Sequence, residues 1–289
     1  MANLSDTAES LAAALPPLMV RAEHLASALT LGMHGRRKAG IGQSFWQYHH
    51  YRPGDPSTAI DWRQSAKSEH LYVREREWEA AQSVWLWRDG SPNMRFGSGT
   101  ETKIERASLL ALALGVLLVR GGERIALYGE REPPANSRAA YRRIGFALTE
   151  RAPSDNPLPP DAPLPRNAQF VWFSDFLSSL DEIERSIRRL THANAGGRLV
   201  HIIDPAEEDF PFSGRTRFES VSGVETHTLG RAESVANDYR ARFKAHAEAV
   251  ALLARKLGWN YTAHRTDRSP QAALVALYAD LSGGHRMAG

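Results

Sequence analysis

The sequence contains no cysteine among its 289 residues. Disulfide bonds, zinc fingers, iron–sulfur clusters and thiol catalysis are therefore excluded, and the absence agrees with a reducing compartment. A long hydrophobic run is also lacking, because the most apolar stretch, 107–119, is shorter than the about 20 residues that a bilayer span needs. Asp6 and Glu9 stand where a signal peptide would carry positive charge. We expect a cytoplasmic protein with no membrane span.

The sequence also has little excess charge of either sign. It carries 36 Lys and Arg against 33 Asp and Glu, for a net charge of +3, and the two signs are interspersed along the chain. Proteins that bind nucleic acid usually gather their basic residues on one face. We therefore expect no nucleic-acid partner.

From about residue 83 onward, short β-favouring runs alternate with helical patterns. Capping boxes at Thr102/Glu105 and Ser179/Glu182 mark two helix starts. Alternating β and α units predict an α/β fold of the Rossmann-like, doubly wound type, with a mostly parallel sheet and helices on both faces. The predicted strands cover 83–87, 124–128, 168–174, 198–203, 225–229 and 259–264, and the predicted helices cover 102–120, 137–150, 179–192, 231–257 and 269–281.

The chain divides into three predicted parts. Residues 1–33 are expected to form short helices, and residues 81–289 the α/β domain. Between them, 34–80 is rich in glycine, aromatic and charged residues without helical periodicity. We expect this middle segment to pack on the main domain.

Three aspartates, Asp89, Asp175 and Asp204, follow predicted strands directly. Ligands of open α/β sheets bind beyond the carboxyl ends of the strands. Asp89, Ser91 and Asn93 alternate in one loop, and with Asp175 they would offer the oxygen ligands that Mg²⁺ prefers. The alternative is that Asp, Ser and Asn simply form the turn, as they commonly do.

A second class of function would use the same strand ends. Asp89, Asp175 and Asp204 would then form the acidic cluster of a Mg²⁺-dependent phosphoester hydrolase. The sequence contains no phosphate-binding glycine motif, no nucleophile elbow and no paired histidine metal motif. We therefore expect a protein that is not an enzyme.

A series of motifs in a fixed order resembles the signature of the DUF58 family. The motifs are Gly40-Ile41-Gly42-Gln43-Ser44-Phe45, Tyr51-Arg52-Pro53-Gly54-Asp55, Ile60-Asp61-Trp62-Arg63, Asp89-Gly90-Ser91-Pro92-Asn93, Phe96-Gly97, Lys103 and Ser174-Asp175-Phe176. The resemblance implies a von Willebrand factor A-like domain that bears a metal-ion-dependent adhesion site. It also implies a role as an adaptor of a MoxR-type AAA+ ATPase.

On this resemblance, Asp89, Ser91, Asn93 and Asp175 would hold Mg²⁺ and leave one position for a carboxylate of the partner. Asn93 replaces the serine that the adhesion motif prefers, and no threonine is identified to complete the site. Arg88 and Arg95 flank the loop, and they would repel a dication if they pointed inward.

Four charged residues of the signature segment form a second predicted contact surface for a partner: Arg52, Asp55, Asp61 and Arg63. The alternative is that they form an internal salt-bridge network. A metal-free scaffold of the same fold remains open as a third interpretation of the whole chain.

Overall fold

The computed structural model describes residues 17–34, 45–52, 60–68, 70–76, 82–150, 156–220 and 226–283. The chain forms two compact units, residues 31–81 and a larger unit of residues 1–30 and 82–289. The segment predicted over 34–80 lies within the smaller unit.

The smaller unit is built on an antiparallel pair of strands, β1 (Phe45–His50) and β2 (Tyr72–Arg76). A one-turn helix, α3 (Trp62–Ser65), precedes β2. Asp61 caps α3, because its carboxylate accepts hydrogen bonds from the backbone N–H groups of Arg63 and Gln64. The side chain of Trp62 is 65% exposed.

The larger unit contains a five-stranded sheet in which all neighbouring strands are parallel. This confirms the predicted mostly parallel, doubly wound sheet. The strands stand in the order β4-β3-β5-β6-β9. Their bounds are β3 Ser83–Arg88, β4 Arg124–Leu127, β5 Gln169–Ser174, β6 Gly196–Ile203 and β9 Asn260–Arg265.

The strand order reverses between β3 and β5, since the chain moves from β3 to β4 on one side and then to β5 on the other. Such a switch point leaves a crevice at the carboxyl ends of the two strands. Asp89 follows β3 and Asp175 follows β5. The fold therefore places two of the three predicted aspartates at its switch point.

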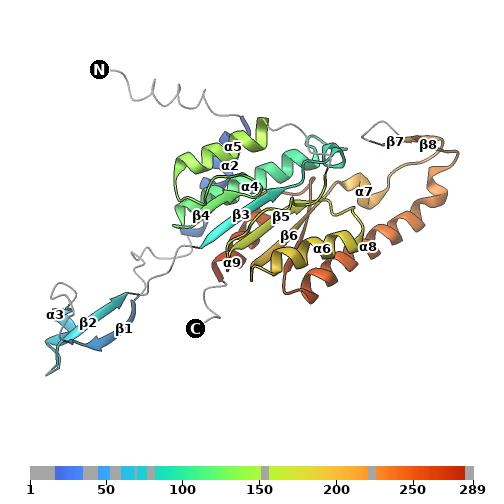
Figure 1. Ribbon diagram of the computed structural model, residues 1–289. Coiled ribbons are helices and arrows are strands. Elements are labelled where there is room, and N and C mark those ends of the chain that lie inside the picture. The colour runs from blue at the N-terminus through green and yellow to red at the C-terminus, as the bar shows by residue number, and fades with distance from the viewer. Residues whose placement is uncertain are drawn as a thin grey trace, which may run out of the picture. The chain divides into compact units, whose positions relative to one another are not determined.

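Helices cover both faces of the sheet (Figure 1). The helices α4 (Lys103–Arg120), α5 (Arg138–Glu150) and α9 (Pro270–Gly283) pack on one face, and α6 (Leu180–Thr191) and α8 (Ala236–Lys256) pack on the other. An outer helix, α2 (Pro17–His34), adds Met19 to the core beside α5. Both predicted capping boxes, at Thr102 and Ser179, are present.

The two faces have different cores. On the α4 face the core is mainly aliphatic, and most of α4 is buried because it contacts the sheet and also α5 and α9. On the α6 and α8 face the core is aromatic. Edge-to-face contacts join Trp85 to Tyr128, Tyr128 to Phe170, and Trp87 to Trp172.

A second, smaller sheet pairs β7 (Thr216–Glu219) with β8 (Thr226–Leu229) in an antiparallel ribbon. The predicted strand at 225–229 is thus present, but it does not join the parallel sheet. A short helix, α7 (Pro205–Asp209), leads from β6 toward this ribbon, and the one-turn 3-10 helices η2 (Pro92–Arg95) and η3 (Ala232–Val235) precede α4 and α8. Among the helices in the described ranges, none is long and apolar enough to cross a bilayer.

Candidate functional site

The loop after β3 is folded around the carboxylate of Asp89, which is fully buried. Its Oδ1 accepts a hydrogen bond from the backbone N–H of Ser91 at 2.7 Å, and its Oδ2 accepts one from the hydroxyl of Ser174 at 2.8 Å. The backbone N–H of Asp89 donates to the carbonyl of Phe173 on β5 at 2.8 Å. These bonds fix the loop to the end of the neighbouring strand.

Burial raises the pKa of Asp89 from 3.8 to about 6, and the negative charge of Asp175 adds to this rise. The hydrogen bonds from Ser91 and Ser174 oppose the rise in pKa without cancelling it. The hydroxyl of Ser91 is also buried, and it has no hydrogen-bond partner among the described residues. This loop therefore retains capacity for one more polar contact.

The second aspartate of the switch point, Asp175, pairs with a lysine. The Nζ of Lys103 lies 2.9 Å from Oδ2 of Asp175, and it also donates a hydrogen bond to Oε1 of Glu207. The side chain of Lys103 has no exposed surface, and that of Asp175 is 4% exposed. One buried ammonium thus lies between two carboxylates.

Lys103 is the first residue of α4, directly after the capping residue Thr102. The helix dipole disfavours a cation at this end, so the two carboxylates supply the charge that makes the position favourable. Burial alone would lower the pKa of Lys103, but the negative charges of Asp175 and Glu207 outweigh burial, and the pKa is raised. Lys103 is therefore charged in the folded protein.

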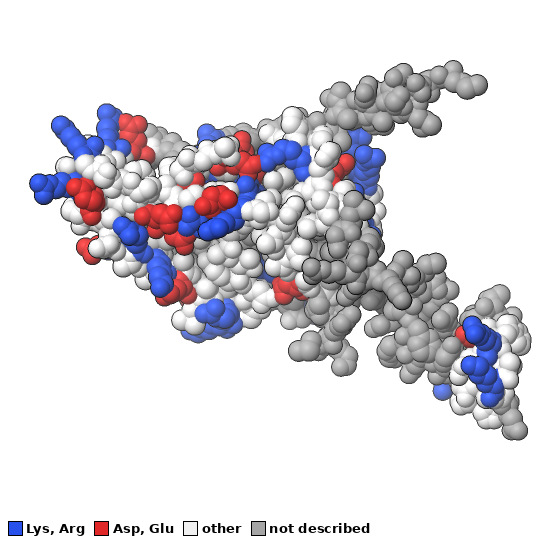
Figure 2. Space-filling view, turned by 180° about the vertical axis from the view of Figure 1, so that it is seen from behind, with Lys and Arg blue, Asp and Glu red and all other residues white. Residues whose placement is uncertain are grey.

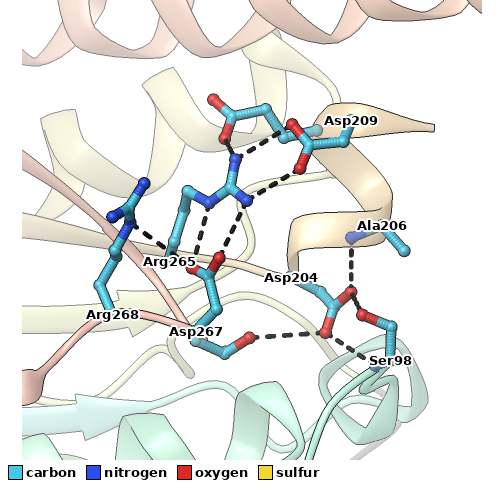
Figure 3. A network of polar contacts seen from close by, with 9 residues as sticks. Ser98, Asp204, Ala206, Asp209, Arg265, Asp267 and Arg268 are labelled. Carbon is cyan, nitrogen blue, oxygen red and sulfur yellow. Dashed lines mark hydrogen bonds and ion pairs between the residues drawn. The ribbon is translucent and has the colours of Figure 1, made fainter. Parts of the chain in front are cut away.

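Glu207 is held in place by the capping box of α7, in which the backbone N–H of Asp204 donates to Oε2 of Glu207. Figure 3 shows the contacts of the Asp204 carboxylate. Asp204 is the capping residue: its carboxylate accepts from the backbone N–H of Ala206 at 2.9 Å, and from the N–H and hydroxyl of Ser98 at 2.8 and 2.5 Å. Asp204 is fully buried. Its oxygens are engaged in holding α7 and the loop of Ser98 together.

A salt-bridge network holds the far end of α7 (Figure 3). Arg265, the last residue of β9, donates to Asp209 at 2.9 Å and to Asp267 at 3.0 Å, and it also contacts Glu208. Arg265 is anchored in the parallel sheet. The network therefore ties α7, and with it Glu207, to the end of β9.

A pocket of about 540 Å³ opens beside the strand ends. Its lining is mainly apolar and includes the aromatic cluster formed by α7, the β7–β8 ribbon and α8. Asn93 and Glu207 line its side toward the switch point, and Leu177, which is 44% exposed, lies after β5. The aromatic side chains that line it are those of Phe96, Phe210, Phe212, Phe218 and Tyr239.

The structure brings together only part of the predicted metal set. Asp89, Ser91 and Asp175 are buried at the switch point, whereas Asn93 is exposed and lines the pocket. Arg88 does not oppose a cation there, because its guanidinium donates to the hydroxyl of Ser108 and the carbonyl of Leu148, on α4 and α5.

The predicted second contact surface belongs to the smaller unit. Asp61 caps α3, and Arg52 and Arg63 are exposed. Asp55 lies outside the described residues. The assignment of these residues to a partner contact stays a prediction.

The four predicted ligands, Asp89, Ser91, Asn93 and Asp175, do not fit a Mg²⁺ ion, given the contacts that their side chains make in the folded protein. A dication bound by Asp175 would lie within a few Å of the Lys103 ammonium, which repels it. In the ranges that the structure covers, no group of three or more His, Asp or Glu side chains is arranged to hold a metal ion. The unpartnered Ser91 hydroxyl and the buried Asp89 are features of a metal-binding loop. Asp175 does not complete such a site, because it is already paired with Lys103.

Sequence reasoning identified Asp89 and Asp175 but gave no role to Lys103 or Glu207. Lys103 lies 72 positions from Asp175 and 104 from Glu207, so no local pattern joins them. One signal was available: a lysine at the first position of a capped helix stands against the helix dipole and calls for an acidic partner.

Charges of both signs lie next to one another on the face drawn in Figure 2. In the larger unit, the basic side chains on this face are accompanied by Asp and Glu rather than gathered into one uniform patch. This arrangement agrees with the nearly balanced composition.

Comparison with known proteins gives the family. The sequence profile described as "Protein of unknown function DUF58" matches residues 47–249, which is more than half of the chain. The match confirms the resemblance seen in the motifs. The strand order, with an antiparallel bridge from Ile125 of β4 to Ala135, agrees with the expected von Willebrand factor A-like fold.

Among curated proteins, the chain is similar to uncharacterized proteins of Mycobacterium tuberculosis and Mycobacterium bovis. Each is 26% identical over 289 residues, which cover 95% of this chain and 90% of the relative. The similarity therefore extends over nearly the full length of this chain and of each relative.

Among solved structures, an aerotolerance-related membrane protein of Bacteroides fragilis covers 70% of this chain and 100% of its own, with a TM-score of 0.42 and 14% identity. BatB of Bacteroides thetaiotaomicron covers 71% and 100%, with a TM-score of 0.42 and 11% identity. The VWA domain of SpRpn10 covers 68% and 95%, with a TM-score of 0.33 and 9% identity.

Proposed function

The chain belongs to the DUF58 family, and on this premise we propose that it is a protein-interaction module that works with a MoxR-type AAA+ ATPase in the cytoplasm. The partner class comes from the family resemblance in the motifs. The proposed binding surface is the pocket beside the strand ends together with the switch point, and the lining of this pocket supports the proposal.

The pocket is the observation that carries this proposal. It lies at the carboxyl ends of the strands, where open α/β sheets bind their ligands, and its lining is mainly apolar. Phe210, Phe212 and Phe218 offer aromatic surface, which is enriched at protein interfaces. Such a lining suits an apolar side chain of a partner protein better than a phosphoester.

The polar groups near the pocket favour binding over catalysis. Asp204 is engaged in capping α7, and Asp175 and Glu207 are engaged by Lys103. A hydrolase that uses the strand-end aspartates would need them free to hold metal and substrate. Because the charges of Asp175 and Glu207 are balanced by Lys103 within the protein, these contacts support a role in binding a partner rather than in catalysis.

The test is a binding measurement between this protein and the purified MoxR-type ATPase of the same organism, with nucleotide present. We expect Leu177→Asp to weaken binding at least about tenfold, because a charge at the pocket must be desolvated in the complex. Leu252→Asp is the matched control, since Leu252 is 61% exposed on α8 and does not line the pocket. We expect it to bind like the unchanged protein.

Two outcomes would contradict the proposal. If the unchanged protein does not bind the ATPase, the partner is wrong. If Leu177→Asp and Leu252→Asp bind equally well, the pocket is not the binding surface. Circular dichroism of both variants checks that each is folded.

A further inference from the structure

The charge arrangement at the switch point differs from that of a metal site in one respect. A site of this kind gathers carboxylates around an added cation. Here Asp175 and Glu207 face a cation that belongs to the chain, the ammonium of Lys103. Because all three side chains are largely or fully buried, bulk water screens this interaction little.

We propose that the Lys103 ammonium occupies the position of a divalent metal ion at the switch point. The folded protein therefore neither needs nor binds a divalent metal ion there. This inference concerns the protein alone. It does not depend on the ATPase or on the pocket.

The position of the ammonium is the first argument. Its Nζ lies 2.9 Å from Oδ2 of Asp175, and it donates to Glu207 as well. An ammonium has three donors and no acceptor, so two of its N–H groups are directed at carboxylates. The aromatic ring of Phe96, whose centroid lies 6.0 Å from Nζ, flanks the same ammonium.

The support around the ammonium is the second argument. Lys103 begins α4, which is buried along most of its length, and Asp175 directly follows the central strand β5. Glu207 is held by the Asp204 cap and the Arg265 network. A free metal ion exchanges with solvent, whereas this cation is covalently attached and fixed by the packing of three elements.

The remaining oxygen groups do not call for a dication. The two carboxylate oxygens of Asp89 each accept a hydrogen bond from within the protein, from Ser91 and from Ser174. The Ser91 hydroxyl is buried without a partner in the described part of the chain. A single water molecule is a sufficient partner for one hydroxyl group.

The experiment measures divalent cations against the folded protein in the absence of any partner. Mn²⁺ is the probe, because the electron paramagnetic resonance signal of the free ion falls when the ion binds. For the unchanged protein we expect no loss of the Mn²⁺ signal at micromolar concentrations. We also expect melting temperatures with Mg²⁺ and with EDTA to agree within about 1 °C.

The variant Lys103→Ala removes the ammonium and leaves the carboxylates in place. We expect this variant to bind about one equivalent of Mn²⁺, and Mg²⁺ at about ten times its Kd to raise its melting temperature by roughly 3 °C. Both gains should disappear in the double variant Lys103→Ala/Asp175→Asn. Lys244→Ala, which removes a lysine whose side chain is 77% exposed, is the control and should behave like the unchanged protein.

Each outcome decides the matter. Mn²⁺ binding by the unchanged protein that is lost in Asp89→Asn would overturn the proposal. So would a folded Lys103→Ala variant that binds no Mn²⁺, because the ammonium would then not occupy a position suited to a metal. If Lys103→Ala does not fold, the titration of the unchanged protein still decides whether the edge takes a metal.

Discussion

Lys103 and Asp175 form a buried ion pair across the switch point of the sheet, with 2.9 Å between Nζ and Oδ2. The pair joins the first residue of α4 to the residue that follows β5. It therefore links the helix that follows β3 to the end of β5, the strand beside β3.

Replacing Lys103 by Met removes the charge but keeps a side chain of similar length. Asp175 and Glu207 would then be buried without their cation, and we expect a loss of about 3–5 kcal/mol in the free energy of unfolding. Urea denaturation measures this loss. Lys244→Met, at an exposed position, should change the free energy of unfolding by less than about 0.5 kcal/mol. A loss below about 1 kcal/mol for Lys103→Met would contradict the pairing described here.

The contribution of Asp89 to the free energy of unfolding should fall as the pH rises from about 4 to about 6. Its pKa is about 6 in the folded protein, against an ordinary value of 3.8. In this window the folded protein binds the proton and the unfolded chain releases it, so raising the pH favours unfolding. The favourable contribution of protonated Asp89 is complete below the ordinary pKa, and it is lost as the pH rises through the folded value.

The variant Asp89→Asn cannot ionise, so it should lack this dependence. The free energy of unfolding of Asp89→Asn, relative to that of the unchanged protein, should rise by up to about 3 kcal/mol from pH 4 to pH 7. Urea titrations at several pH values measure the difference. A difference that stays constant with pH would show that Asp89 titrates normally.

Asp204→Ala should destabilise the larger unit by about 2–4 kcal/mol. The substitution removes the acceptor of the N–H groups of Ser98 and Ala206, and it leaves the buried N–H of Ala206 unpaired. Ser179→Ala is the matched comparison, because it removes the cap of α6 at an exposed position and should cost about 1 kcal/mol. Thermal and urea denaturation measure both. Equal losses would mean that Asp204 acts only as a helix cap.

Gly197→Ala should destabilise the protein by about 3 kcal/mol through steric overlap. A Cβ at this position would lie 1.9 Å from the ring of Trp259, which is 1% exposed and cannot move aside easily. At Gly230 a Cβ would meet no atom within 4 Å. Gly230→Ala should therefore change the free energy of unfolding by less than about 0.5 kcal/mol. Tryptophan fluorescence during denaturation reports on both variants.

The sequence predicted the parallel sheet well, because its strands are apolar runs and its helices begin with strong signals. Thr102 with Glu105 and Ser179 with Glu182 each formed the expected capping box. The same logic was overlooked at Asp204. This aspartate is followed by Pro205 and, three positions on, by Glu207, which is the pattern of a helix start, and the structure forms a capping box there.

The candidate site was predictable only in part. Asp89 and Asp175 could be found because each follows an apolar strand, and parallel strands end at one edge. The partner of Asp175 could not be found from spacing, since Lys103 and Glu207 come from other elements and meet only through the fold. In the small ribbon, β8 was predicted at 225–229, whereas its partner β7 was not, because its four residues are partly polar and carry no strong strand signal.

The burial of α4 sets the timescale on which Lys103 can leave its carboxylates. Backbone amides exchange with solvent fastest in segments that open locally, and most slowly where opening requires the whole unit to unfold. With buried positions along nearly its entire length, α4 belongs to the second class. Glu207 belongs to α7, a helix of five residues in which only Ala206 is buried, so its opening disrupts fewer packing contacts than the opening of α4. When the structure at the strand ends opens, backbone amide exchange should therefore increase first in α7, while the amides of α4 stay protected.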